Sequence, residues 1–456
     1  MNPRFSAMWR AELAPDAPGY SVLLLPNNAT YSGDPVEPNL ADAFGVGFDT
    51  SNPRPFGTNS NKWFGPAGNF YDRPQREISL HRNGREIANV LCPVPLTTHG
   101  GNQMGLDIEY ASGGALVTVT VDGTKVYDRY FVPELFPTHS QFATAGNVRI
   151  SGLRHTPLRS MATPQPNRVV AFDKALNDAQ NHRQTNMVAF PESSNGVGRV
   201  VITLRLDPTP RGIDPWDRLA NLYLYDDNGE RFEILRWITP YRKAWEWKAD
   251  VTDFLPLLKG KKKLEMSCET YSEGWLVSIT FDFYQGRLER VPYKVVNLWS
   301  GAPPIGLAEQ PIEKFFVPRT VDVERECIGA RFRSVVTGHG MEPNTDNAGE
   351  FHPLWRKLHV NGQTWQNNLW KEDVYLNPCR PQGGTWKFDR AGWAPGDLVT
   401  PWMVELDSPL TPETLTNGRV RDSAVCESHP EQRLSGAAPG RGAAYSVSSP
   451  LSLSSR

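Results

Sequence analysis

The chain of 456 residues contains no run of 18 apolar side chains, so its sequence predicts no membrane-spanning helix. Its first 20 residues lack the apolar core of a secretory signal. The five cysteines are scattered and form no CxxC pair, which predicts neither a disulfide framework nor a zinc site. The net charge is −2 and no basic cluster is visible, which argues against nucleic acid or an anionic membrane as the main partner. The composition favours small or neutral ligands.

Familiar catalytic signatures are also missing. The sequence has no GxSxG nucleophile elbow, no P-loop, no GxGxxG motif opening a helix and no HExxH motif. A thiol hydrolase built on Cys268 is disfavoured, because a cysteine within an apolar strand is usually inert. These absences exclude most nucleotide-dependent, serine-hydrolase and zinc-protease chemistry.

The residues that are abundant predict an all-β protein. Glycine (38), proline (39) and aromatic residues (11%) accompany many short alternating runs. The runs 76–87 and 115–131 alternate around an Asn-Gly and an Asp-Gly pair, which favour type I′ hairpins because both residues tolerate a positive φ. The run 199–206 alternates in the same way and predicts a half-buried strand.

The alternating runs, linkers and changes of composition predict a division of the chain into six parts. These are a first sandwich (1–152), a polar linker (153–166), a second sandwich (167–298), a connector rich in glycine and proline (299–311), a third sandwich (312–416) and a small-residue, polar tail that we expect to be disordered (417–456).

Carboxylates stand near aromatic residues at three places. Sugars present apolar C–H faces to aromatic rings and hydroxyls to carboxylates, so such neighbours suit a glycan site. The alternative is that each acid is a solvated residue at a strand end. The three places are Asp214 and Asp217 around Trp216, Glu269 near Tyr271, and Glu350 beside Phe351.

A copper site is a weaker alternative. His339, His352 and His359 lie near one another in the third part of the sequence, and imidazole suits copper. Copper monooxygenases built from two sandwiches take histidines from both, and the second part offers only His182. We therefore favour structural roles for these histidines.

The segment "ADAFGVGFDT" and the two hairpins after it resemble the concanavalin A-like lectin and glucanase sandwich over residues 15–150. The resemblance implies a glycan-binding face in the first part. No acid pair of the glucanase type is visible, and a spacer without a ligand is the alternative.

Residues 167 to about 415 resemble the peptide-N-glycosidase F family. The resemblance implies two adjacent eight-stranded jelly-roll-type β-sandwiches after the N-terminal concanavalin A-like sandwich. Its segments are "NRVVAFDKALNDA", "DPWDRLANLYL", "RWITPY", "DVTDFLPLLKG", "SCETY", "VVTGHGMEP", "GEFHPLWRKLHVNG" and "GGTWKFDRAGWAPGD".

Members of that family hydrolyse the amide between asparagine and the first N-acetylglucosamine of N-linked glycans, leaving aspartate and a glycosylamine. The resemblance implies Asp217, Glu350 and Glu269 as catalytic acids, with Asp217 the primary carboxylate. Asp214 is then most simply a turn or capping residue. The implied substrate contacts are Arg218, Trp216, Tyr271, Phe351, Trp393 and Arg390.

The same resemblance implies a glycoprotein or glycopeptide substrate, no metal or organic cofactor, no nucleic-acid or membrane partner, and a monomer. It also implies a secreted or periplasmic protein. The sequence departs from the family where three cysteine pairs are replaced, by Pro208 with Ile213, Ala348 with His352, and Val374 with Ala394. Their loss weakens the inference of an oxidising compartment and leaves a cytoplasmic location open.

The polar tail from Asn417 is the second departure, because the family continues there with aromatic strands. Missing strands would leave the third sandwich open at a sheet edge. A non-catalytic glycan-binding protein with a degenerate cleft is therefore the alternative to an amidase.

Overall fold

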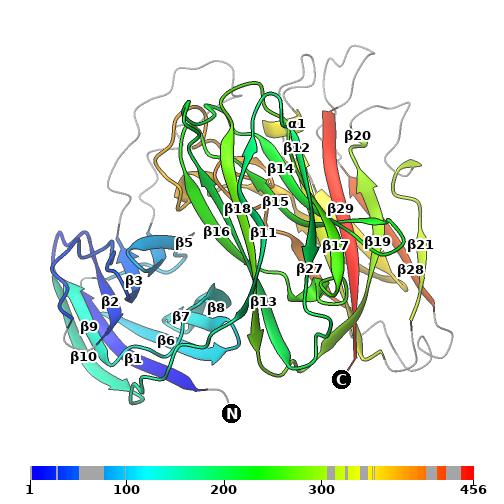
Figure 1. Ribbon diagram of the computed structural model, residues 1–456. Helices are drawn as coiled ribbons and strands as arrows, with labels where there is room; N and C mark the ends of the chain where they lie inside the picture. Colours follow the sequence, from blue (N-terminus) through cyan, green and yellow to red (C-terminus); the bar gives the residue numbers. More distant parts are fainter. Residues whose placement is uncertain are drawn as a thin grey trace. The chain divides into compact units, whose positions relative to one another are not determined.

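A computed structural model describes residues 3–26, 29–50, 76–97, 99–305, 314–323, 327–338, 348–351, 353, 355–406, 419–427 and 443–455 (Figure 1). The fold is nearly all β, as the sequence predicted. The chain divides into two compact units, Met1–Asn167 with Leu376–Pro378 (unit 1) and Arg168–Tyr375 with Cys379–Arg456 (unit 2). No helix among the described residues has the length and apolar character needed to span a bilayer.

Unit 1 contains two five-stranded antiparallel sheets whose facing sides bury one apolar cluster that includes Trp9, Tyr20 and Phe48. Both predicted hairpins are confirmed, since the Asn-Gly and Asp-Gly pairs have positive φ at 83–84 and 122–123. One sheet orders β10 (Val148–His155), β1 (Arg4–Leu13), β6 (Asn102–Ala111), β7 (Gly114–Val121) and β8 (Thr124–Pro133). The other orders β5 (Arg85–Leu91), β4 (Glu77–Arg82), β3 (Phe44–Asp49), β2 (Gly19–Leu25) and β9 (Gln141–Gly146).

The first sandwich of unit 2 has two four-stranded sheets. The predicted alternation in 199–206 is confirmed, because Val200, Ile202, Leu204 and Leu206 are all buried in one core. One sheet orders β11 (Asn167–Asn177), β18 (Trp275–Gln285), β13 (Val197–Asp207) and β16 (Trp245–Asp250). The other orders β12 (Arg183–Ala189), β17 (Lys261–Cys268), β14 (Leu219–Tyr225) and β15 (Arg231–Ile238).

The second sandwich of unit 2 takes strands from widely separated segments. One sheet orders β19 (Val291–Gly301), β29 (Ala443–Ser455), β22 (Gly329–Gly338) and β27 (Trp402–Glu405), with β20 (Pro304–Ile305) also paired to β29. The other orders β21 (Arg319–Asp322), β28 (Arg419–Glu427), β23 (Trp355–Val360) and β24 (Gln363–Asn368). A short ribbon joins β25 (Trp370–Lys371) to β26 (Arg390–Ala391).

The tail 417–456, expected to be disordered, instead contributes β28 and β29. The backbone of β29 pairs with β19 on one side and β22 on the other, and β28 pairs with β21 and β23. The segment is composed of small and polar residues, which give a weak strand signal, but pairing along both edges satisfies its backbone donors and acceptors. The terminal segment therefore fills the middle of both sheets. The expected boundary at 298 also falls inside β19, which pairs with β29.

Candidate active site

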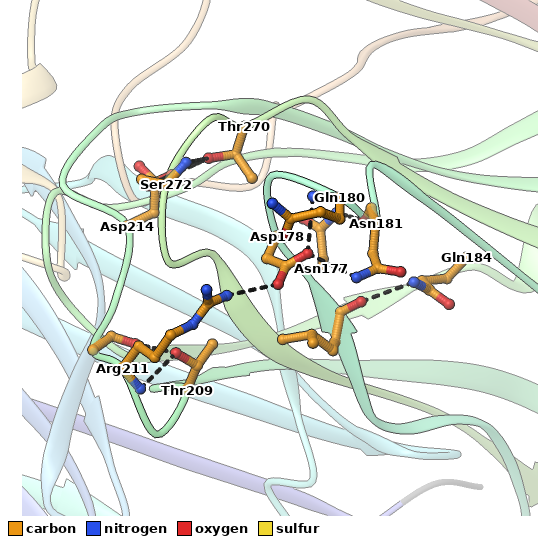
Figure 2. Close-up of polar contacts among 12 residues, drawn as sticks. Asn177, Asp178, Gln180, Asn181, Gln184, Thr209, Arg211, Asp214, Thr270 and Ser272 are labelled. Carbon is orange, nitrogen blue, oxygen red and sulfur yellow. Dashed lines mark hydrogen bonds and ion pairs between the residues drawn. The ribbon is translucent and has the colours of Figure 1, made fainter.

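Asp214 anchors the loop between β13 and β14. Its carboxylate is fully buried and accepts hydrogen bonds from the backbone N–H of Trp216 (2.7 Å) and from the hydroxyls of Thr270 and Ser272. Figure 2 shows Asp214 beside these two hydroxyl residues. A carboxylate that bonds the N–H two residues later forms an Asx turn. The geometry confirms the predicted turn role of Asp214.

The peptide that carries Asp217 is held from the neighbouring strand end. The Thr239 hydroxyl accepts a hydrogen bond from the backbone N–H of Arg218 (2.7 Å) and donates one to the carbonyl oxygen of Trp216 (2.9 Å). The Asp217 side chain is nearly buried, whereas the Trp216 side chain is 55% exposed. The loop thus presents an indole outward and a carboxylate inward.

The loop after β17 places a second aromatic ring beside the loop that carries Trp216 and Asp217. Tyr271 is 70% exposed, its hydroxyl donates to the exposed carboxylate of Glu269, and this hydrogen bond raises the pKa of the phenol. The guanidinium carbon of Arg218 lies 5.7 Å from the centre of the Tyr271 ring. Arg218 Nε lies 3.7 Å from Asp214 Oδ1, and the Tyr271 ring that Arg218 faces is the one whose hydroxyl bonds Glu269.

The connection between β11 and β12, which lie in different sheets, supports both loops. Asn177 donates to the carbonyl oxygen of Cys268 (3.1 Å), and Arg211 forms an ion pair with Asp178 at 2.7 Å (Figure 2). Gly274 has a φ of +68°, and a Cβ there would lie 1.8 Å from the carbonyl oxygen of Asn177. Glycine is therefore required where the two loops meet.

Glu350 comes from the other sandwich of unit 2, on the short helix α1 (Ala348–Phe351). The buried guanidinium of Arg390, on β26, connects it to Asp217. Its Nε donates to Glu350 Oε1 at 3.0 Å, and its Nη2 lies 3.7 Å from Asp217 Oδ2. One arginine therefore brings together two acids that the sequence placed in separate motifs.

Arg390 has no surface to offer a sugar, because it is fully buried and its other donors are taken by the protein. Nη1 donates to the carbonyl oxygens of Thr385 (2.8 Å) and Phe388 (2.7 Å), and Nη2 donates to Thr385 Oγ1 (2.7 Å). The rings of Phe351 and Trp393 lie 5.1 Å and 4.8 Å from its guanidinium carbon.

The expected substrate contacts therefore fall into two groups. Trp216 and Tyr271 are exposed, whereas Arg390 and Trp393 are fully buried and Phe351 is partly buried. Trp393 packs with Ile238, Val335 and Val399, and its indole N–H donates to the carbonyl oxygen of Gly338. Burial corrects the expectation that Arg390 and Trp393 contact sugar directly.

Backbone hydrogen bonds join the two sandwiches of unit 2 at the end of β15. The N–H of Ile238 donates to the carbonyl oxygen of Asp397 (3.0 Å), and the N–H of Gly396 donates back to that of Ile238 (3.0 Å). The N–H of Val399 also donates to the carbonyl oxygen of Arg236 (2.9 Å). The segment 396–399 thus pairs with the edge strand β15 through backbone hydrogen bonds.

The sequence analysis missed Thr239, which holds the peptide of Asp217, and also Tyr241 and Thr385, which contact each other next to Arg390. All three lie in segments of the family resemblance, "RWITPY" and "GGTWKFDRAGW". They are uncharged, so no charge pattern could have identified them.

In the part of the chain that the structure describes, His359 and Cys268 provide no support for the alternative chemistries. His359 bonds Thr364 Oγ1 at 2.7 Å, and His339 and His352 lie outside the described residues. Among the described side chains, the group that could hold a metal ion is Glu37, His81 and Glu86 in unit 1, where the His81 ring nitrogens already contact Asn39 and Ser79 at 2.8 Å. Burial raises the pKa of the Cys268 thiol, which disfavours a thiolate nucleophile.

Known proteins share both sequence and fold with this chain. The family described as peptide-N-glycosidase F, C terminal, matches residues 311–437. The amidase F of Elizabethkingia miricola, a peptide-N(4)-(N-acetyl-beta-D-glucosaminyl)asparagine amidase, is 27% identical over 279 residues, which are 57% of this chain and 79% of the relative.

Solved structures of such amidases have a similar fold. One, titled a peptide-N(4)-(N-acetyl-beta-D-glucosaminyl) asparagine amidase, matches with a TM-score of 0.54 and 23% identity over 63% of this chain and 96% of its own. The glycosylasparaginase PNGase F from Flavobacterium meningosepticum matches with the same TM-score and identity, over 63% of this chain and 95% of its own. These two likenesses concern the fold.

Proposed function

Because the chain belongs to a peptide-N-glycosidase F-like family, we propose that it is an amidase acting on N-linked glycoproteins or glycopeptides. The reaction is hydrolysis of the amide between asparagine and the first N-acetylglucosamine. One observation carries the proposal: Asp217 and Glu350, from different sandwiches of unit 2, lie against the same buried arginine, Arg390. Two carboxylates held together in this way suit proton transfer to and from a water molecule.

The chemistry requires both acids, because water is a poor nucleophile and an amide nitrogen is a poor leaving group. Asp217 is the primary carboxylate and accepts a proton from the attacking water, with Glu350 as its partner through that water. The new C–O bond forms as the C–N bond breaks, and the nitrogen takes the bonding electron pair and a proton. Aspartate and a glycosylamine result. Arg390 offsets the repulsion between the two like charges.

Trp216 and Tyr271 are the proposed sugar contacts, since both rings are exposed beside Asp217 and Glu269. Aromatic faces bind the C–H faces of sugars, and Glu269 can accept hydrogen bonds from hydroxyls or the acetamido group. Arg218 supports the Tyr271 ring. Arg390, Trp393 and Phe351 act instead as support for Glu350.

The sandwich of unit 1 is proposed as a glycan-binding module that keeps the chain on glycosylated surfaces and so raises the local substrate concentration. The proposed reaction needs one copy of the chain and no metal or organic cofactor, and its substrates place it outside the cytoplasm. The test is to compare unit 2 alone with the full chain on a glycoprotein surface. Equal activity would argue that unit 1 is a spacer.

The test is incubation of the full chain with a denatured N-glycoprotein in 18O-labelled water, followed by mass spectrometry of the peptides. We expect asparagine at glycosylation sites to become aspartate carrying the heavy oxygen. Asp217→Asn should lower the rate roughly 10²-fold or more. The matched control is Asp128→Asn, an exposed carboxylate of unit 1, which should keep full activity. Full activity in Asp217→Asn would refute the assignment, and glycan binding without conversion would favour the non-catalytic alternative.

A further inference from the structure

Tyr241 lies just beyond β15 and is held by the loop 382–385 of the other sandwich. Its ring is buried, its backbone N–H donates to Gln382 Oε1 at 3.1 Å, and its hydroxyl lies 2.9 Å from Thr385 Oγ1. A Cβ on Gly384 would lie 2.5 Å from the ring carbon Cε1 of Tyr241. Glycine at this position allows the loop to close against the ring, so both the ring and the hydroxyl have a fixed position.

The hydroxyl of Tyr241 lies at one end of a chain of polar groups. Arg390 Nη2 donates to Thr385 Oγ1 at 2.7 Å, and the same arginine donates to Glu350. Asp217 Oδ2 lies 3.7 Å from the same Nη2, and the charge of Asp217 contributes to the raised pKa of the Tyr241 phenol. Tyr241, Thr385 and the two proposed catalytic acids therefore form one cluster of polar groups around Arg390.

The direction of these hydrogen bonds follows from the chemistry of the groups. A guanidinium only donates and an ionised carboxylate only accepts. In a hydrogen bond between Tyr241 and Asp217 the phenol is therefore the donor, and Thr385, which accepts from Arg390, can donate its own proton to the Tyr241 oxygen. Burial, and after it the charge of Asp217, raises the pKa of the Tyr241 phenol, so the phenol keeps its proton.

We propose that Tyr241, oriented by Thr385, is a positioning residue that donates a hydrogen bond to Asp217 and holds this carboxylate in its reactive direction. This inference rests on the proposed amidase function. Tyr241 need not touch the substrate, and its effect passes through Asp217. Thr385 acts one step further away, through Tyr241.

Activity tests the proposal with Tyr241→Phe, Thr385→Val and Thr385→Ser. Tyr241→Phe removes only the hydroxyl, and we expect kcat to fall about 10- to 100-fold with KM little changed, the loss of one hydrogen bond to a charged group. The acidic limb of the pH profile should move to higher pH, because the ionised carboxylate loses a donor. Thr385→Val should change both in the same direction, and Thr385→Ser should restore them.

The double variant Tyr241→Phe, Thr385→Val should resemble Tyr241→Phe alone, because Thr385 acts through Tyr241. The matched control is Tyr127→Phe, a buried tyrosine of unit 1 whose hydroxyl donates to the carbonyl oxygen of Ile78 at 2.9 Å. It removes a comparable buried hydrogen bond and should leave kcat and the pH profile unchanged.

A second measurement does not depend on turnover. In protein labelled with 13C at the aspartate side-chain carboxyl, the Asp217 signal, assigned with Asp217→Asn, should titrate at higher pH in Tyr241→Phe than in the wild type. An unchanged titration would overturn the positioning role, even if activity fell. An inactive wild-type chain would refute the amidase, and the titration would still decide whether Tyr241 donates to Asp217.

Discussion

Arg236 and Arg390 are both fully buried in unit 2 and each pairs with a glutamate, but they distribute their donors differently. Arg236 gives two hydrogen bonds of 2.6 Å to the same carboxylate, Glu233, and a third of 3.0 Å to Thr337. Arg390 gives one hydrogen bond to Glu350 and three to Thr385 and Phe388, and its guanidinium also faces Asp217.

The two arrangements serve different purposes. The bidentate pair of Arg236 and Glu233 matches a planar fork to a planar carboxylate, and Asn221 also donates to Glu233 (3.0 Å). This pair fastens β15 to β22 through Thr337. Arg390 is fixed mainly by carbonyl and hydroxyl oxygens, so it can attract two acids without enclosing either of them. Both arginines are equally buried, so burial does not tell the structural arginine, Arg236, from the arginine of the candidate active site, Arg390. The two differ in which groups accept their hydrogen bonds.

The origin of the two pairs also differs. Residues three apart on a regular strand point to opposite faces, but the register of β14 and β15 shifts between Leu222 and Tyr223, which leaves one extra residue in β15. This bulge brings Glu233 and Arg236 to the same side. Arg390 and its acids are assembled instead from loops and short elements of both sandwiches, so their proximity depends on the whole of unit 2.

The largest effect is expected from Arg236→Met, which leaves the Glu233 carboxylate buried without its cation. The free energy of unfolding should fall by about 3–5 kcal/mol, measured by chemical denaturation. Adding Glu233→Leu should recover most of this loss, because an apolar pair needs no desolvation of charge. A double variant as unstable as Arg236→Met would contradict this account.

Glu350→Gln tests the other arginine. The amide oxygen can still accept from Arg390 Nε, so we expect the free energy of unfolding to change by less than about 1 kcal/mol. The rate of glycopeptide hydrolysis should fall roughly 10²-fold or more, about 3 kcal/mol in the barrier, because the amide cannot take part in proton transfer. If stability fell as it does for Arg236→Met, Glu350 would be a structural residue.

His139 extends the comparison to a buried group in unit 1 that the fold keeps uncharged. Burial lowers its pKa from 6.5 to about 4, so the folded state favours the neutral ring. The neutral ring therefore stabilises the folded state fully at a pH above the pKa of this histidine in the unfolded chain. This stabilisation is lost as the pH falls towards the lower pKa of the folded state. Unit 1 should lose about 2 kcal/mol between pH 7.5 and pH 5.

This pH dependence is measured by denaturation of unit 1 at several pH values. His139→Gln should flatten it, because the proton-binding group is removed. The exposed His155 provides the control, and His155→Gln should leave the pH dependence as it is. A wild-type stability that does not change between these pH values would disprove the role of His139.

The smallest effect is expected from Lys125→Ala. Its ion pair with Asp128 (2.9 Å) is exposed on both sides, and water screens such pairs. The free energy of unfolding should change by less than about 1 kcal/mol, and salt should reduce even that. A loss comparable to that of Arg236→Met would show that burial does not decide the strength of these pairs.

Short segments of the sequence are enough to predict the local features of this protein. Alternating residues predicted the strand β13, Asn-Gly and Asp-Gly pairs predicted the hairpins, and the segment "DPWDR" indicated which of its two acids is the turn residue. Each of these depends on backbone conformation and on which side of a strand a residue faces. Neighbouring residues set both properties, so a short segment is sufficient to predict them.

The contacts between distant residues, and which side chains stay exposed to solvent, follow only from the folded chain. It placed Arg390 between Asp217 and Glu350, buried Trp393 while leaving Tyr271 exposed, and paired the terminal strand β29 on both edges. A segment with weak strand propensity forms a strand when neighbouring strands on both sides satisfy its backbone hydrogen bonds. An arginine has a structural role when carbonyl oxygens accept its hydrogen bonds. Both outcomes depend on partners far away in the sequence.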